Sequence, residues 1–398
     1  MKASIATEPG ARIEGVIPLC VPELRGNEWE YVRKCLDTGW VSSVGEYVAH
    51  FEEVLANTAG VKYAVATVNG TAALHTALQC VGVEADDEVL VSNLTFIAPA
   101  NAIRYLGAHP VFIDSEPQFW EMDPNLVERF LKTECDWDGT TLRDRANGRR
   151  IKAILPVDIL GSPVDLDPIN AVAKKFGLAV VEDATESLGA KYRGKPVGQQ
   201  ADITCFSFNG NKLVTTGGGG MIVTNDSSLA ERARYLTTQA KDDPVEYIHG
   251  EVGYNYRLTN VQAAIGVAQM EMFDEYVAIK RANARRYSAL LGEVKGLTPM
   301  REPSYATSSF WLYTVLVDEV QFGMSSRGLL AFLASKNIQT RPLWQSMHRS
   351  PAHVGSRYFG GDVAERLCQQ ALSLPSSVGL TQEQLDSVVK VIGAASKK

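Results

Sequence analysis

Short apolar segments alternate with longer amphipathic segments from about residue 60 onward. The segments 63–68 and 178–184 are almost continuously apolar, which is typical of strands that are buried on both faces. The segment 71–82 repeats its apolar positions with the period of a helix. The pattern therefore predicts an α/β fold, in which a mostly parallel sheet is flanked by helices. Further strands are predicted at 88–93, 110–115, 152–159, 203–208 and 219–225.

The pattern of apolar and polar positions changes after about Asn260. A long helical pattern covers 261–291, and shorter strand and helix patterns follow it. A chain of 398 residues is also long enough for two or three domains. We therefore expect a large α/β domain over 1–260, which includes the N-terminal segment, and a smaller α+β domain over 261–398. The polar segment 132–150 is expected to form a surface hairpin or excursion.

Composition and charge exclude several classes of function. The chain has 39 Lys and Arg against 46 Asp and Glu, a net charge of −7, so a nucleic-acid partner is not expected. The six cysteines are scattered without a CxxC pair, which argues against a disulfide framework and against a metal site. No signal peptide is recognisable, and no apolar run reaches about 18 residues. We expect a cytoplasmic protein that does not enter a membrane.

A turn at Asn69-Gly70-Thr71 joins a predicted strand to a predicted helix. Glycine permits close approach of the backbone to a ligand, and the N–H groups at a helix start attract phosphate. A helix cap without any ligand explains the same residues, so both interpretations stay open at this point.

Asp183 follows a run of apolar residues at the end of a predicted strand. An isolated carboxylate in such surroundings is costly, so this group needs a partner. A protonated heterocyclic nitrogen would serve, and so would a structural salt bridge or a helix cap.

Lys212 lies in a turn just beyond a predicted strand, with Ser207 before it and the glycines 217–220 after it. A glycine run favours close approach of the backbone to a rigid group. A desolvated amine in such a place becomes able to form a Schiff base, whereas the ordinary alternative is a solvated surface lysine. The glycines do not form a Walker A loop, because the motif G-x-x-x-x-G-K-[ST] is absent.

In this order along the chain, the turn, the strand-end aspartate and the lysine before a glycine run resemble the DegT/DnrJ/EryC1/StrS family of sugar aminotransferases. The resemblance covers nearly the whole chain in seven collinear blocks. They include NGTAALHTAL, VVEDATESLGAKY, CFSFNGNKLVTTGGGGMIVTND and GYNYRLTNVQAAIG. The resemblance implies the type I, aspartate-aminotransferase-like fold and the cofactor pyridoxal 5′-phosphate.

The resemblance also implies roles for the residues singled out above. Lys212 would form the Schiff base with the cofactor and would then move a proton as general base. Asp183 would keep the pyridine nitrogen of the cofactor protonated. The other expected cofactor contacts are Gly70, Thr71, Ala72 and Ser207 at the phosphate, Phe96 stacked on the ring and Glu186 beside it.

Further blocks imply contacts with a second subunit and with a sugar. Asn255, in GYNYR, corresponds to a family residue that reaches the phosphate of the neighbouring subunit, which implies a homodimer with the active site at the interface. Asp158 departs from the family pattern, which commonly has His there. The blocks that line the sugar site in relatives contain Trp40, Ser42, Trp344 and His348, although simple packing explains the tryptophans as well.

The resemblance implies L-glutamate as amino donor and a nucleotide-linked keto-sugar as acceptor. Dehydratase relatives carry His in place of Lys212, so transamination is expected. The block NGNK-x-x-TTGGGG and the segment 132–150 look most like the branch that aminates C4 of UDP-4-keto-6-deoxy-N-acetylhexosamines on legionaminic acid and bacillosamine routes. One alternative is a GDP-4-keto-6-deoxymannose aminotransferase of the perosamine type, and a second is a non-catalytic regulatory protein on the same fold.

Overall fold

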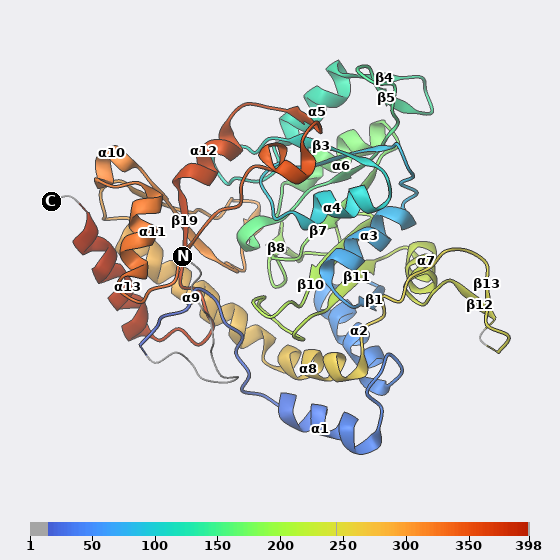
Figure 1. The fold of residues 1–398 in the computed structure, drawn as a ribbon, viewed down its shortest axis with the longest axis horizontal. Coiled ribbons are helices and arrows are strands. Elements are labelled where there is room, and N and C mark those ends of the chain that lie inside the picture. Colours follow the sequence, from blue (N-terminus) through green and yellow to red (C-terminus); the bar gives the residue numbers. More distant parts are fainter. Residues whose placement is uncertain (1–14, 244, 397–398) are drawn as a thin grey trace.

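The computed structural model describes residues 15–243 and 245–396. Its main element is an eight-stranded sheet with the spatial order β1-β11-β10-β7-β6-β2-β3-β18 (Figure 1). Neighbouring strands are parallel except at β11, which runs antiparallel to β1 and to β10. The predicted α/β fold class is confirmed. The strands are β1 (Tyr63–Thr67), β11 (Gly220–Thr224), β10 (Ile203–Ser207), β7 (Ala179–Asp183), β6 (Ile151–Leu155), β2 (Glu88–Ser92), β3 (His109–Ile113) and β18 (Arg357–Phe359).

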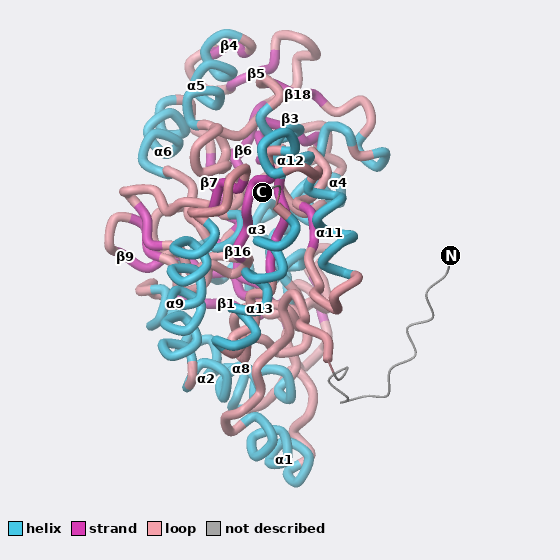
Figure 2. The backbone as a smooth tube through the Cα atoms, turned by 90° about the vertical axis from the view of Figure 1, so that its left-hand side faces the viewer, coloured by secondary structure: helices cyan, strands magenta, loops and turns pink. Residues whose placement is uncertain are grey.

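Helices pack on both faces of this sheet (Figures 1 and 2). In β1, Val65 points into the core cluster that contains Leu74, whereas Ala64 and Ala66 point into the opposite cluster with Phe51. Successive side chains of a strand point to opposite faces, so both faces of the strand are buried. The covering helices are α2 (Glu46–Ala59), α3 (Gly70–Cys80), α4 (Ala98–Tyr105), α5 (Pro124–Thr133), α6 (Leu166–Lys175), α7 (Ser227–Thr237) and α8 (Asn260–Glu271).

A smaller antiparallel sheet with the order β14-β16-β19-β17 is built from the C-terminal part of the chain. Its strands are β14 (Leu297–Pro299), β16 (Tyr313–Val317), β19 (Ala371–Leu374) and β17 (Arg341–Pro342). The accompanying helices are α9 (Phe273–Leu291), α10 (Glu319–Phe322), α11 (Ser326–Ala334), α12 (Val363–Gln370) and α13 (Gln382–Ala395). Between β17 and β19 the chain returns to the large sheet as β18, which pairs with β3. The division of the chain into 1–260 and 261–398 stays a prediction.

The long helical pattern over 261–291 forms two helices, not one. The helix α8 ends at Glu271 and α9 begins at Phe273, because Met272 leaves helical geometry with φ −101° and ψ 2°. The predicted hairpin in 132–150 is present as β4 (Cys135–Trp137) and β5 (Leu142–Asp144).

Several short elements lie at the surface. The hairpin of β12 (Lys241–Asp243) and β13 (Ile248–His249) projects from the body of the molecule, on the right in Figure 1. No helix within the described ranges is both long and apolar enough to span a membrane. The remaining elements are α1 (Glu28–Thr38), β8 (Lys191–Tyr192), β9 (Lys195–Pro196), β15 (Ala306–Thr307) and the 3₁₀ turns η1 (Ile159–Gly161), η2 (Met347–Arg349) and η3 (Pro351–His353).

Candidate active site

The candidate site lies at the carboxyl ends of three strands of the large sheet. Asp183 ends β7, Ser207 ends β10, and the turn at Asn69 follows β1. These three strands point the same way, so their carboxyl ends share one edge of the sheet. Ligands of open α/β sheets bind at this edge.

The turn after β1 meets the end of β10 very closely. Asn69 caps α3, since its Oδ1 accepts the N–H of Ala72 at 2.8 Å, so the helix-cap interpretation of this turn is correct. A Cβ atom at Gly70 would lie 2.9 Å from Cβ of Ser207, a separation that real Cβ atoms do not tolerate. Glycine therefore lets the N-terminus of α3 approach a serine hydroxyl, and the two groups together suit a phosphate. The structure thus brings Gly70, Thr71 and Ala72 to one place with Ser207.

The Asp183 carboxyl group is almost completely buried. Its Oδ1 accepts the N–H of Thr185 at 3.0 Å. Burial raises the pKa of Asp183, while the bonds from Thr185 and the charge of Lys212 act in the opposite direction. No ion pair of Asp183 within 4 Å occurs in the described part of the chain, so the structural salt bridge considered above is not found. The carboxylate is therefore available to a cationic ligand.

The Lys212 amine lies between an acid and an aromatic ring. Its Nζ is 3.5 Å from Glu186 Oε1 and 4.1 Å from the ring centre of Trp311. Trp311 is held in place because its Nε1 donates to the backbone oxygen of Asn211 at 2.7 Å. Burial raises the pKa of Glu186 to about 7, and the nearby charge of Lys212 acts against this rise. The lysine is thus withdrawn from bulk water, and the solvated-surface interpretation is wrong.

The glycine run after Lys212 serves the packing of the protein itself. Gly217 has φ +77°, a left-handed conformation that favours glycine. A Cβ atom at Gly220 would lie 2.5 Å from the backbone oxygen of Asn69. Gly220, at the start of β11, therefore packs directly against the backbone of the turn at Asn69-Gly70-Thr71.

Four of the expected ligand residues are exposed on the single chain. Phe96 follows β2, and Asn255 forms a short antiparallel bridge with Thr238. Trp40 and Ser42 lie in the loop between α1 and α2. No hydrogen bond or ion pair joins these four side chains to Lys212 within residues 15–243 and 245–396.

The other two expected sugar-site residues lie on the segment that follows β17. Trp344 is partly buried against the main core cluster. His348 is fixed from both sides, since Nδ1 lies 3.0 Å from Asn93 Oδ1 and Nε2 lies 2.9 Å from Glu365 Oε1. His348 also stacks on Tyr358 with ring centres 4.1 Å apart.

Sequence reasoning missed several residues that contact the site. Trp311 comes from a segment about 100 residues after Lys212 and could not be placed beside it from local pattern. Glu182 and Glu121 are buried close to Asp183 and Asp158. A glutamate within the apolar strand 178–184 was the available signal for the first of them.

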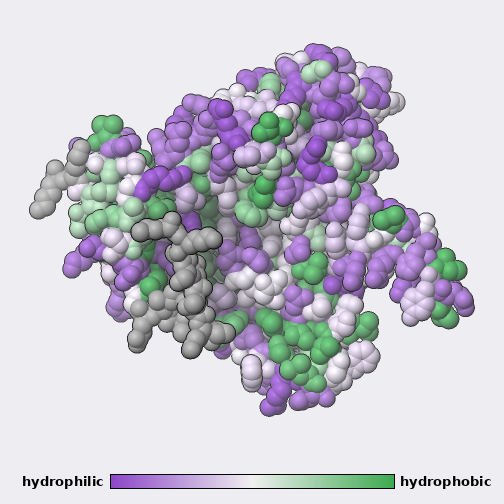
Figure 3. All heavy atoms as spheres, in the orientation of Figure 1, coloured by the Kyte–Doolittle hydropathy of each residue, from purple (hydrophilic) through white to green (hydrophobic). Residues whose placement is uncertain are grey.

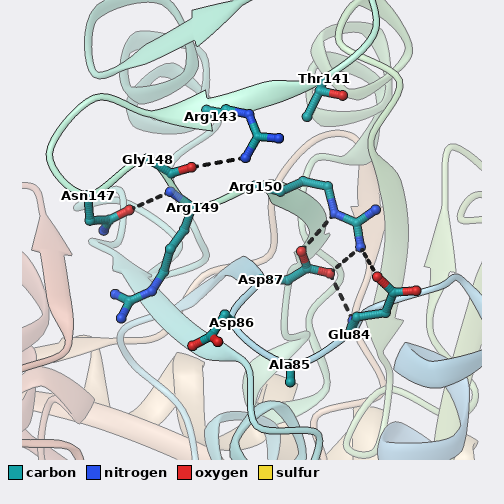
Figure 4. A pocket seen from close by; sticks show the side chains of 10 residues that line it. All are labelled: Glu84, Ala85, Asp86, Asp87, Thr141, Arg143, Asn147, Gly148, Arg149 and Arg150. Carbon is teal, nitrogen blue, oxygen red and sulfur yellow. Dashed lines mark hydrogen bonds and ion pairs between the residues drawn. The ribbon is translucent and has the colours of Figure 1, made fainter.

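A separate cavity of about 480 Å³ lies beside the first residues of β2 and β6, at the opposite edge of the sheet (Figure 4). Its most enclosed cation, Arg150, donates to Asp87 at 2.6 and 2.7 Å and to Glu84 at 3.0 Å. Arg143 donates to the backbone oxygen of Gly148. The residues that line this cavity include no lysine, so they cannot form a Schiff base.

Comparison with known proteins identifies the class of enzyme. Residues 22–393 match the DegT/DnrJ/EryC1/StrS aminotransferase family, and the chain belongs to this family. It is therefore a pyridoxal phosphate-dependent sugar aminotransferase with the type I fold of such enzymes.

Three individual proteins show how similar this chain is to other members of the family. EpsN of Bacillus subtilis (strain 168), provisionally named a pyridoxal phosphate-dependent aminotransferase, is 39% identical over 94% of this chain and 95% of its own. The GDP-perosamine synthase of Caulobacter vibrioides is also 39% identical, over 94% of this chain and 97% of its own. A crystal structure of a DegT DnrJ EryC1 StrS aminotransferase from Brucella abortus has a TM-score of 0.85 and 27% identity, covering 94% of this chain and 96% of that one.

Proposed function

We propose that this enzyme transfers the amino group of L-glutamate to the C4 keto group of GDP-4-keto-6-deoxymannose, a reaction of the perosamine type. The observation that carries the proposal is the 39% identity, over nearly the full length of both chains, to a GDP-perosamine synthase. The interpretation as a UDP-sugar enzyme rests on the block NGNK-x-x-TTGGGG and on the segment 132–150, and it is less well supported. It becomes the alternative.

Within this proposal, the residues at the strand ends hold the cofactor. The start of α3 at Gly70, Thr71 and Ala72, together with the Ser207 hydroxyl, binds its phosphate. The buried Asp183 carboxylate, which lacks an ionic partner in the described chain, binds the protonated ring nitrogen. Both features fit pyridoxal phosphate, because they supply an anion cradle and a buried anion.

Bound pyridoxal phosphate supplies an electron sink that stabilises negative charge on the carbon next to the transferred nitrogen. Lys212 would hold the cofactor through Nζ and, once released from it, would act as the general base that moves a proton. Glu186, within 3.5 Å of Nζ and with a pKa of about 7, is able to hold a proton beside the amine at neutral pH. Trp311 covers the amine and excludes water from it.

We assign the exposed residues to contacts made in a homodimer. Phe96 stacks on the cofactor ring, and Asn255 reaches the phosphate in the neighbouring subunit. Exposed apolar side chains support such an interface, since Trp29 and Leu36 on α1 are largely uncovered. Figure 3 shows apolar residues gathered near α1, at the bottom of the view. Trp40, Ser42, Trp344 and His348 line the sugar subsite in the same proposal.

The test is a competition between acceptors. The purified enzyme is incubated with pyridoxal phosphate, L-glutamate and either GDP-4-keto-6-deoxymannose or UDP-4-keto-6-deoxy-N-acetylglucosamine, and the amino sugar is detected by mass spectrometry. We expect the GDP sugar to be aminated with equimolar release of 2-oxoglutarate, and Lys212→Ala to release none. Amination of the UDP sugar alone would overturn the proposed acceptor and support the alternative.

A further inference from the structure

Five buried carboxyl groups lie in and behind the candidate site. They belong to Glu121, Asp158, Glu182, Asp183 and Glu186, and none of their residues is more than 7% exposed. Carboxylates so close together in a low-dielectric region cannot all be ionised. Asp183 and Glu186 already have roles in the proposed function, whereas Asp158 has no role in it.

Asp158 connects three parts of the backbone around the site. Its Oδ1 accepts the N–H of Val164 at 2.9 Å, and its Oδ2 accepts the hydroxyl of Ser187 at 2.7 Å. Its own N–H donates to the backbone oxygen of Asp183 at 3.0 Å. One fully buried side chain therefore ties the turn after β6 to the turn after β7.

Both of these turns support Glu186. Leu160, in the turn after β6, donates its N–H to Glu186 Oε2 at 2.8 Å. Leu160 has φ +56°, a left-handed conformation that a branched side chain rarely adopts without support from its surroundings. Ser187 directly follows Glu186 in the sequence. Asp158 therefore lies in the turn that donates to Glu186 and bonds to the turn that contains Glu186.

We propose that Asp158 is a positioning residue, which clamps the two turns and thereby fixes Glu186 against the Lys212 amine. This inference rests on the proposed role of Lys212 as the amine that holds the cofactor. Asp158 itself has no contact with the amine among the described residues, so it acts through Glu186.

The buried carboxyl groups of Asp158 and Glu182 are close enough to interact, and such a pair shares a proton. Burial and the neighbouring Glu182 raise the pKa of Asp158 well above its usual range. An asparagine amide is nearly isosteric with this neutral acid and offers the same acceptor to Val164. It would also donate to Ser187 Oγ, whose hydrogen is then free for the backbone oxygen of Ala184.

Charged groups face Glu186 from three elements. Lys212 reaches it from the loop after β10, Asp183 from the end of β7, and Glu121 from the loop before α5. Lys212 is the cation among them, so the negative charge of Glu186 favours the protonated amine. Displacement of Glu186 should therefore remove a stabilising acid from beside the amine and make the amine more reactive toward an electrophile.

The experiment measures Lys212 directly in the cofactor-free protein. The apoenzyme is labelled with trinitrobenzene sulfonate at a series of pH values, and the rate at Lys212 is followed by peptide mass spectrometry. For Asp158→Ala we expect labelling at pH 7 to become about three to ten times faster, which corresponds to the loss of about 0.7–1.4 kcal/mol of interaction with the amine. Asp158→Asn should keep the wild-type profile. The absorbance of the reconstituted holoenzyme should show a matching shift of its pH titration for Asp158→Ala alone.

Two further variants keep the test decisive. Asp114→Ala removes a comparably buried aspartate at the end of β3, which caps α12 instead, and should leave Lys212 labelling unchanged. If Asp158→Ala does not fold, Ser187→Ala removes one of the two hydrogen bonds to the Asp158 side chain and should accelerate labelling about two- to threefold. A folded Asp158→Ala or Ser187→Ala protein with the wild-type profile would overturn the proposal. Neither sugar nor glutamate enters this assay, so failure to aminate the GDP sugar leaves its outcome unaffected.

Discussion

Lys212 Nζ and Glu186 Oε1 lie 3.5 Å apart, and both side chains are largely removed from water. A lysine and a glutamate in this position form more than a structural ion pair, because burial holds the pKa of the acid at about 7. Glu186 is therefore able to take up or release a proton near neutral pH, which suits the proton transfers of a transaminase.

The proposed phosphate site, at the start of α3 and beside Ser207, is tested by a substitution of Ser207. Replacing Ser207 by Ala removes a hydroxyl beside the start of α3, and a hydrogen bond to a charged group contributes about 1.5–3 kcal/mol. We expect the dissociation constant of pyridoxal phosphate to rise at least about tenfold, measured by absorbance titration of the apoenzyme. Ser288→Ala, which removes a hydroxyl bonded to Tyr313, is the control and should bind normally. Equal affinities for the two variants would argue against this phosphate site.

The close packing of the glycine run is tested at Gly220. A methyl group there would meet the backbone of Asn69 at 2.5 Å, and neither backbone segment is free to move. We expect Gly220→Ala to lower the free energy of unfolding by about 2 kcal/mol, measured by urea denaturation. Gly393→Ala on α13 meets no neighbouring atom and should raise stability by about 0.5–1 kcal/mol. A neutral Gly220→Ala would show that the contact relaxes without cost.

The buried acids predict a pH dependence of stability. Burial raises the pKa of Glu182 to about 7, above the ordinary value of 4.5. The folded state therefore binds this proton more tightly than the unfolded state, so stability falls as the pH rises from about 4.5 to about 7. Glu182→Gln removes this loss. We expect the variant to gain about 2 kcal/mol over wild type at pH 8 relative to pH 5, in paired urea titrations. A constant difference between the two pH values would contradict the raised pKa.

The proposed subunit interface is tested on α1. Trp29 is 83% exposed on the single chain, so Trp29→Lys should not disturb the fold but should oppose association through this face. We expect the variant to shift toward the monomer in sedimentation velocity at micromolar concentration. Val320→Lys, at a position that is 85% exposed on α10, is the matched control and should sediment as wild type. If both variants keep the wild-type sedimentation coefficient, the interface lies elsewhere.

The sequence predicted the large sheet well because buried parallel strands carry a local signal. The predicted strands 178–184 and 203–208 became β7 and β10, and the strand-end positions of Asp183 and Ser207 followed from them. Contacts that depend on distant packing were not predictable. Trp311 reaches Lys212 from the C-terminal part of the chain. The left-handed Leu160 is held by side chains that local periodicity does not reveal.

The edge strand β18 has a consequence for how the active site can open. The chain leaves the large sheet through α9, returns to it as β18 and leaves it again for β19. Several segments of the chain therefore connect the small sheet to the large sheet, so the small sheet cannot rotate outward about a single linker. Any substrate that acts at Lys212 must reach it through an entrance shaped by loops and side chains, while the two sheets keep their mutual arrangement.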